Sequence, residues 1–137
     1  MVESNHPDEW SQSERFQRGW QRLKEIDGKA GEQVVESLQA IAPDLARYVV
    51  EFPFGDISMR PGLDLKSRQI ATVAALTALG TAQPQLKIHL RAALNVGCTQ
   101  AELVEVVMQM AVYAGFPAAL NGMAVLKEVL AEAAAAD

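Results

Sequence analysis

Cysteine and histidine are scarce in this chain of 137 residues, and each shortage excludes a class of protein. The single cysteine, Cys98, leaves no disulfide to form within the chain, which is typical of proteins of the reducing cytoplasm. Of the two histidines, only His89 lies outside the N-terminal tail. One interior histidine is too few for a histidine-rich metal site, and no Cys or His spacing is typical of zinc. We therefore expect no metal.

Positive charge and long apolar runs are also lacking. Twelve Lys and Arg face 17 Asp and Glu, which gives a net charge of −5 and argues against a nucleic-acid partner. The most apolar region, about 101–120, is interrupted by Glu102, Glu105, Gly115 and Pro117, so it does not predict a membrane span. The N-terminus is polar and lacks the apolar segment of a secretory signal. We expect a cytoplasmic protein with no membrane partner.

Half of the residues are apolar, which is enough for one domain with its own core. We predict a flexible tail over residues 1–8 and a single domain over 9–137. Apolar residues recur at helical spacing and no segment alternates polar with apolar residues, so the fold class is all-α. The expected helices cover about 9–26, 31–42, 43–50, 65–79, 84–96, 100–114 and 117–134. Residues 52–62 are rich in Pro and Gly and predict an irregular connector with one helical turn around Asp56.

Local signals mark the ends of the central helices. Asp64 is a good N-cap and Gly80 a good C-terminal stop for the helix over 65–79. Gly97 suits the left-handed residue that closes the next helix. Thr99 and Glu102 have the spacing of a capping box, in which each side chain bonds the other residue's backbone.

The helix over 65–79 is apolar on nearly all sides after Gln69, which predicts burial between neighbouring helices. A monomer of 14.8 kDa would have difficulty covering three such helices. We therefore expect some of this surface to meet other subunits, with a well-filled monomeric bundle as the alternative.

His89 is the first candidate for chemistry. It lies between a polar stripe of Lys87, Arg91 and Asn95 and the apolar face of its helix. A lone histidine in such a position is more often a structural residue hydrogen-bonded in the core. The alternative is a proton carrier tuned by burial.

Charged residues nearby supply further candidates. Glu102 is explained by capping, so Glu105, one turn deeper, is the better candidate for pairing with His89 or Arg91. Arg60, Arg68 and Arg91 are placed to meet an anionic ligand, although each alone is typical of a surface charge. Cys98 precedes a helix start, where the dipole can lower a thiol pKa. With no second cysteine, it predicts a small turn residue rather than a redox centre.

Two stretches carry a resemblance to a known family: FGDISMRPGLDLKSRQIATVAALTAL and QLKIHLRAALNVGCTQAELVEVVMQMAVYAGFPAALNGM. The most specific pieces are Arg60-Pro-Gly-Leu, His89 with Arg91-Ala-Ala-Leu, and Tyr113-Ala-Gly-Phe-Pro-Ala-Ala. From about residue 31 to 130 the chain closely resembles the carboxymuconolactone decarboxylase family. The resemblance implies the helical fold of alkyl hydroperoxidase D, with about six to seven helices, in a homo-oligomer, either a hexamer or a trimer.

The resemblance also implies an activity, removal of CO₂ from 4-carboxymuconolactone in aromatic degradation, without a cofactor. Such an enzyme must bind a small anionic substrate, stabilise a developing oxyanion and supply one proton. We expect His89 as the proton donor, with Glu105 and Tyr113 as further catalytic residues. Arg60, Arg68 and Arg91 are the expected substrate-binding residues.

The chain also departs from related patterns. The peroxidase relatives carry a Cys-x-x-Cys pair where this chain has Ala82 and Gln85, so a dithiol mechanism is not available on this helix. Gln69 stands where a glutamate is expected in many relatives. Two alternatives to a decarboxylase stay open: a redox protein using Cys98, and a non-catalytic module that binds small acids.

Overall fold

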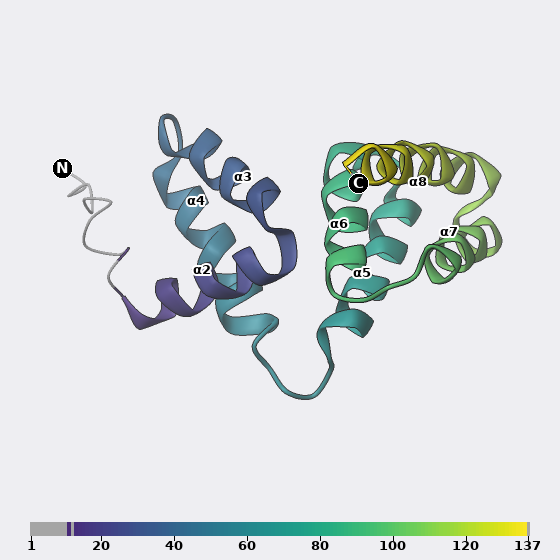
Figure 1. Cartoon of the computed structure of the whole chain (residues 1–137). Helices are drawn as coiled ribbons and strands as arrows, with labels where there is room; N and C mark the ends of the chain where they lie inside the picture. The colour runs from purple at the N-terminus through teal and green to yellow at the C-terminus, as the bar shows by residue number, and fades with distance from the viewer. Residues whose placement is uncertain (1–10, 12, 137) are drawn as a thin grey trace. The chain divides into compact units, whose positions relative to one another are not determined.

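A computed structural model describes residue 11 and residues 13–136, and all regular structure in that part of the chain is helical (Figure 1). The predicted all-α class is thus confirmed. The described chain falls into two compact units, one ending at Gly62 and one beginning at Leu63, which are described separately below. The tail predicted over 1–8 lies outside the described residues, and the single domain over 9–137 stays a prediction. None of the described helices is long and apolar enough to cross a membrane.

The described residues of the first unit form three α-helices and one π-helix. They are α2 (Glu14–Asp27), α3 (Lys29–Gln39), α4 (Pro43–Val49) and η1 (Val50–Ile57). The hydroxyl of Ser13 accepts a hydrogen bond from the backbone of Phe16 and caps α2. Gly28, at φ 60°, makes the turn between α2 and α3, in a backbone conformation that favours glycine. The start predicted near residue 9 falls among residues the structure does not describe.

The π-helix corrects the connector predicted over 52–62. Between η1 and the next helix, only residues 58–64 lie outside helices. Asp56 belongs to a continuous helix rather than to a single turn. Pro53 has no N–H to donate, yet its carbonyl accepts the wide-turn bond from the backbone of Ser58 at 2.9 Å. Local propensity favours a break here, so contacts from elsewhere in the unit must stabilise the helix.

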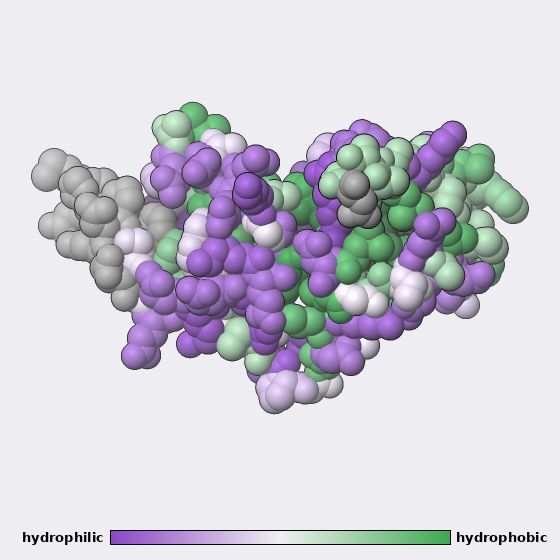
Figure 2. Space-filling view, in the orientation of Figure 1, coloured by the Kyte–Doolittle hydropathy of each residue, from purple (hydrophilic) through white to green (hydrophobic). Residues whose placement is uncertain are grey.

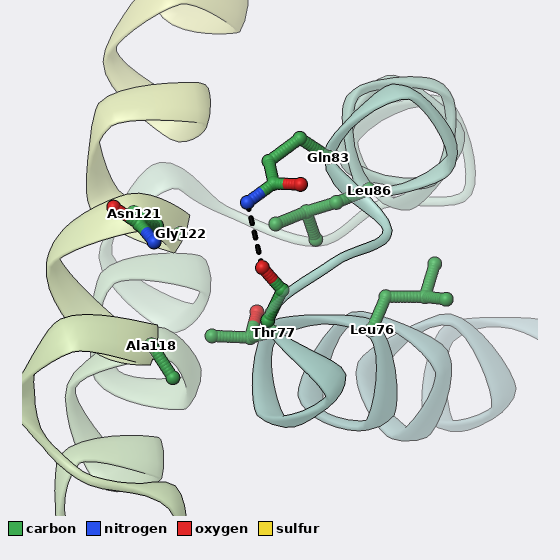
Figure 3. A pocket seen from close by; sticks show the side chains of 8 residues that line it. Leu76, Thr77, Gln83, Leu86, Ala118, Asn121 and Gly122 are labelled. Atoms are coloured by element: carbon green, nitrogen blue, oxygen red, sulfur yellow. Dashed lines mark hydrogen bonds between the residues drawn. The ribbon is translucent and has the colours of Figure 1, made fainter.

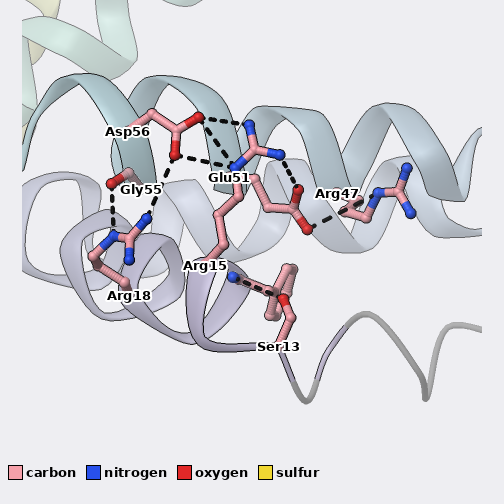
Figure 4. Close-up of polar contacts among 8 residues, drawn as sticks. Ser13, Arg15, Arg18, Arg47, Glu51, Gly55 and Asp56 are labelled. Carbon is pink, nitrogen blue, oxygen red and sulfur yellow. Dashed lines mark hydrogen bonds and ion pairs between the residues drawn. The ribbon is translucent and has the colours of Figure 1, made fainter.

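Those contacts come from α2, which crosses η1 at close range (Figure 4). A Cβ at Gly19 would lie 2.1 Å from the carbonyl oxygen of Val50, so only glycine permits this approach. The Arg15 guanidinium donates to Asp56 at 2.6 Å, and Arg18 donates to the carbonyl of Gly55 at 2.9 Å. These long-range bonds occupy groups of η1 that an irregular loop would leave to water.

The second unit is a bundle of four helices: α5 (Leu65–Leu79), α6 (Gln83–Asn95), α7 (Gln100–Ala114) and α8 (Phe116–Ala136). The predicted ends are confirmed, since Asp64 caps α5, Gly80 has φ 75° and Gly97 has φ 102°. The capping box of Thr99 and Glu102 is present in full. The core draws on all four helices, through Val73, Leu86, Leu90, Ala93, Leu103, Val107, Leu126 and Val129.

Helix α5 is less enclosed than its composition predicts. It packs on α6, α7 and α8, and its buried residues are Gln69, Val73 and Thr77, which lie four residues apart on one face. Its opposite side is open in this chain, and Leu79 is 65% exposed. The expectation of burial on nearly all sides is therefore not met within a single chain.

Asp27, at the end of α2, is a buried carboxylate. It is 9% exposed, and its Oδ1 has no hydrogen-bond partner among the described residues. Helix α3 turns back tightly here, since a Cβ at Gly31 would lie 2.8 Å from the Cβ of Asp27. Burial raises the pKa of Asp27 from 3.8 to about 7, because the charged form loses its hydration. The folded chain therefore binds this proton more tightly than the unfolded chain.

We predict that Asp27→Asn stabilises the protein at alkaline pH and not in acid. Between pH 3.8 and about 7 the unfolded carboxyl ionises while the folded one stays neutral, so stability falls as pH rises through this window. A shift of that size corresponds to about 4 kcal/mol. Thermal unfolding near pH 8.5 should show the variant melting several degrees higher, with little difference near pH 4. An equal gain at both pH values would contradict the burial of a titrating carboxyl.

Candidate active site

His89 projects from α6 toward α5, where its ring contacts the side chain of Gln69. Its Nδ1 lies 3.1 Å from Oε1 of Gln69, which is only 5% exposed. His89 itself is partly buried, and burial lowers its pKa below the usual 6.5. The ring is therefore neutral at neutral pH. His89 is thus hydrogen-bonded within the bundle, as a structural histidine is, and its neutral ring can still accept and release a proton.

The charged groups of the surrounding helices pair elsewhere. Lys66 of α5 forms an ion pair with Glu102 at 3.0 Å. Lys87 of α6 reaches Glu128 at 2.6 Å and Glu132 at 2.9 Å, and Arg91 also pairs with Glu132 of α8. Burial is accordingly the cause of the lowered pKa of His89, with no nearby charge contributing.

Glu105 and Tyr113 of α7 are not brought to His89 in this chain. Glu105 is exposed and pairs with neither His89 nor Arg91, so the pairing expected from the sequence is not seen within the described residues. Tyr113 is 78% exposed. Both side chains are exposed, and their catalytic roles stay predictions.

The other expected anion-binding residues lie on different units. Arg68 is on the first turn of α5, where its Nε donates to the carbonyl of Leu63 at 3.1 Å. Arg60 belongs to the first unit, and its backbone N–H donates to the carbonyl of Ile57. Arg91 is held toward α8 by Glu132. Within the second unit, the hydrogen bond between His89 and Gln69 is thus the contact on which a candidate site can be built.

Gln69 as the partner of His89 was missed from sequence. A signal for it was available, because Gln69 stands four residues before Val73 and eight before Thr77 on the stripe that α5 buries. A buried amide needs a hydrogen-bond partner. Finding that partner requires knowing that α5 packs on α6, which spacing along one helix does not provide.

A separate crevice lies between the end of α5, the start of α6 and α8 (Figure 3). Its empty volume of about 170 Å³ includes space open to solvent, and it encloses no water-sized cavity. Its polar groups are amides and a hydroxyl: Gln83 donates to the carbonyl of Gly80 at 2.7 Å, and Thr77 donates to Val73 at 2.7 Å. It contains no titratable group, so we do not regard it as the reactive site. No group of three or more His, Cys, Asp or Glu in the described part of the chain is arranged to hold a metal.

Comparisons with known proteins bear on this geometry. Residues 43–128 match the model of the carboxymuconolactone decarboxylase family. A protein named 4-carboxymuconolactone decarboxylase from Acinetobacter baylyi is 34% identical over 117 residues, which cover 85% of this chain and 87% of that relative. An uncharacterised 15.0 kDa protein of Paracoccus denitrificans is 33% identical over 72% of this chain and 74% of its own length.

A third relative has a different named substrate. It is the nitrosuccinic acid decarboxylase of Metarhizium robertsii, 34% identical over 82 residues, which cover 60% of this chain and 57% of that protein. The family match includes His89 and Gln69, and the bacterial decarboxylase aligns over most of both chains. The chain therefore belongs to the carboxymuconolactone decarboxylase family.

Proposed function

We propose that this protein is a cofactor-independent decarboxylase of a small carboxylated acid, with His89 as the residue that delivers the proton. The observation that carries the proposal is the partly buried, neutral imidazole held by Gln69 in a family whose relatives are named decarboxylases. We place the protein in the cytoplasm and its substrate in aromatic-compound degradation, with 4-carboxymuconolactone as the first acid to test.

The two relatives with named substrates suggest the class of acid. Both 4-carboxymuconolactone and nitrosuccinic acid combine a carboxylate with an electron-accepting group, a lactone carbonyl in one and a nitro group in the other. In each, the C–C bond to the departing CO₂ breaks and its electron pair moves onto oxygen atoms of the acceptor. Both acids also keep a second carboxylate. We therefore propose an acid with a built-in electron acceptor and more than one negative charge.

The remaining step is protonation of the carbon that lost CO₂. One proton is consumed for each CO₂ released, and an imidazolium is a suitable donor. The lowered pKa of His89 keeps the free ring neutral, but an anionic substrate beside it favours the charged form. In this scheme substrate binding charges His89, the proton moves to carbon, and solvent restores it. Arg60, Arg68 and Arg91 are proposed to bind the carboxylates, and Glu105 and Tyr113 to assist.

Thiol chemistry is a weaker alternative because of where Cys98 lies. The side chain is 5% exposed, and its Sγ is 3.9 Å from the carbonyl oxygen of Lys66. Burial and the carboxylate of Glu102 raise its pKa, which outweighs the opposing effect of Lys66. The thiolate, which is the reactive form, is therefore scarce at neutral pH.

Self-association into a homo-oligomer, a trimer or hexamer, is part of the proposal. Apolar residues show on the surface at the right of Figure 2, on the side where Figure 1 places α7 and α8. Five large apolar side chains on either side of the turn between these helices, the apolar patch, are more than half exposed: Met108, Val112, Tyr113, Phe116 and Leu120. Exposed apolar surface of this kind is typical of interaction sites. A second copy covering it would also enclose Tyr113, so we propose that the active site is completed between copies.

We expect His89→Ala to lower the turnover of 4-carboxymuconolactone by about 10²–10⁴-fold, the usual effect of losing a positioned acid. CO₂ release measures this directly. His6→Ala removes the chain's other histidine and serves as the matched control. Wild-type protein that binds the acid without consuming it would favour the non-catalytic alternative, and a folded, fully active His89→Ala protein would exclude the mechanism.

Cys98 should react slowly with iodoacetamide in the folded protein at neutral pH, and rapidly once the chain is unfolded. The reason is its burial together with its raised pKa. In a thiol-dependent peroxide assay, Cys98→Ser should behave as the wild type does. Rapid labelling of the native protein, or peroxidase activity lost in Cys98→Ser, would instead support the redox alternative.

Val112→Glu should shift the protein toward smaller species in light scattering. Val112 is 76% exposed, so a charge there costs little in a free chain and would be costly inside an apolar interface. Gln100→Glu, exposed at the opposite end of α7 from the patch, supplies the same new charge as a control. Unchanged mass in Val112→Glu, or a wild-type monomer, would remove the proposed assembly through this patch.

A further inference from the structure

The contact between His89 and Gln69 also bears on which nitrogen of the imidazole ring carries the hydrogen. The structure places Oε1 of the amide, which can only accept, opposite Nδ1 of the ring at 3.1 Å. A neutral imidazole has one nitrogen that donates and one that accepts. The contact with an amide oxygen favours the tautomer in which Nδ1 carries the hydrogen and Nε2 carries the lone pair.

Gln69 is a buried partner for the ring. Its side chain is buried in the α5 stripe with Val73 and Thr77, so exchange of the amide for water is restricted. Nε2 of His89 makes no hydrogen bond to any residue in the described part of the chain, and is the nitrogen left for a substrate. A buried acceptor on one side of a histidine commonly fixes which nitrogen reacts on the other.

Gln69 also differs from a carboxylate in charge. A carboxylate at this distance would stabilise the imidazolium and raise its pKa, whereas an amide orients the ring without supplying charge. Charged groups on the packed helices do not replace it. Ion pairs with one another occupy Lys66 on α5, Lys87 and Arg91 on α6, Glu102 on α7, and Glu128 and Glu132 on α8. Arg68 donates to the carbonyl of Leu63, and Glu105 on α7 and Lys127 on α8 are exposed.

We propose that Gln69 is a positioning residue that holds His89 as the Nδ1–H tautomer and assigns the proton-transferring role to Nε2. The inference rests on the proposed function for its catalytic meaning. In the reaction, Nε2 takes a proton from solvent when the anionic acid binds, and gives it to the substrate carbon after CO₂ has left. The N–H bond at Nε2 breaks, a C–H bond forms, and the ring returns to the Nδ1–H form.

The test is ¹⁵N NMR of the full chain labelled at histidine, followed across pH. Only two histidines contribute, and His6→Ala assigns the signals. The wild-type His89 should show a protonated Nδ1 and an unprotonated Nε2 at neutral pH. Gln69→Leu fills the buried site with an apolar side chain that cannot accept a hydrogen bond, so it should give a mixture of tautomers.

Gln69→Glu should raise the pKa of His89 by about one unit or more, because a carboxylate then faces the ring. The falling limb of kcat/KM with pH should move upward by the same amount. Gln100→Glu, an exposed change of the same kind on α7, should leave the spectrum and the pH profile unchanged. Circular dichroism checks that each variant folds, and the wild-type and Gln69→Leu spectra decide the tautomer even where Gln69→Glu does not fold.

A wild-type ring protonated at Nε2, or a folded Gln69→Leu protein with the wild-type tautomer, would overturn the assignment. A Gln69→Glu protein that folds without changing the His89 pKa would do the same. The spectra are independent of turnover. The expected tautomer in a protein that decarboxylates no acid would therefore contradict the proposed function while leaving the role of Gln69 intact.

Discussion

The chemistry proposed for this protein depends on one constraint, a neutral imidazole kept partly out of water against a neutral amide. Burial lowers the pKa of His89, and Gln69 satisfies one ring nitrogen without offsetting that effect by charge. The four helices of the second unit are what maintain this state. They bury Gln69 in the same stripe as the core residues of α5. They also direct the charged side chains of α6 and α8 into ion pairs with one another, and Lys66 of α5 into an ion pair with Glu102 of α7.

Local signals predicted the ends of the helices well, because caps depend on a few neighbouring residues. Asp64, Gly97 and the pair of Thr99 and Glu102 all act as their spacing predicts. The π-helix could not be found in this way. It contains Pro53 and is stabilised by Arg15 and Arg18, which lie more than 30 residues earlier in the chain. Where distant contacts outweigh local propensity, a sequence pattern indicates a loop and the structure forms a helix.

The candidate site shows the same division between what local spacing predicts and what depends on the packing of helices. His89 was identifiable from sequence as an interior titratable residue, and its partner was not, since the two are 20 residues apart on different helices. Arg91 shows what spacing leaves out. Its role as a ligand-binding cation stays a prediction, and its ion-pair partner in this chain is Glu132, contributed by the last helix. Side-chain spacing identifies which residues share a face, and only the packing of helices identifies what that face meets.

A neutral partner for His89 suits the proposed substrate for an electrostatic reason. A carboxylate beside the ring would keep the imidazolium charged, but it would also repel an acid that carries more than one negative charge. An amide avoids that repulsion and leaves the substrate's own carboxylates to raise the pKa of His89 when they arrive. The donor is then charged only while an acid is bound, and it becomes neutral again once CO₂ and one negative charge have left. In the proposed mechanism, the amide at residue 69 therefore links protonation of the ring to the presence of the substrate that needs the proton.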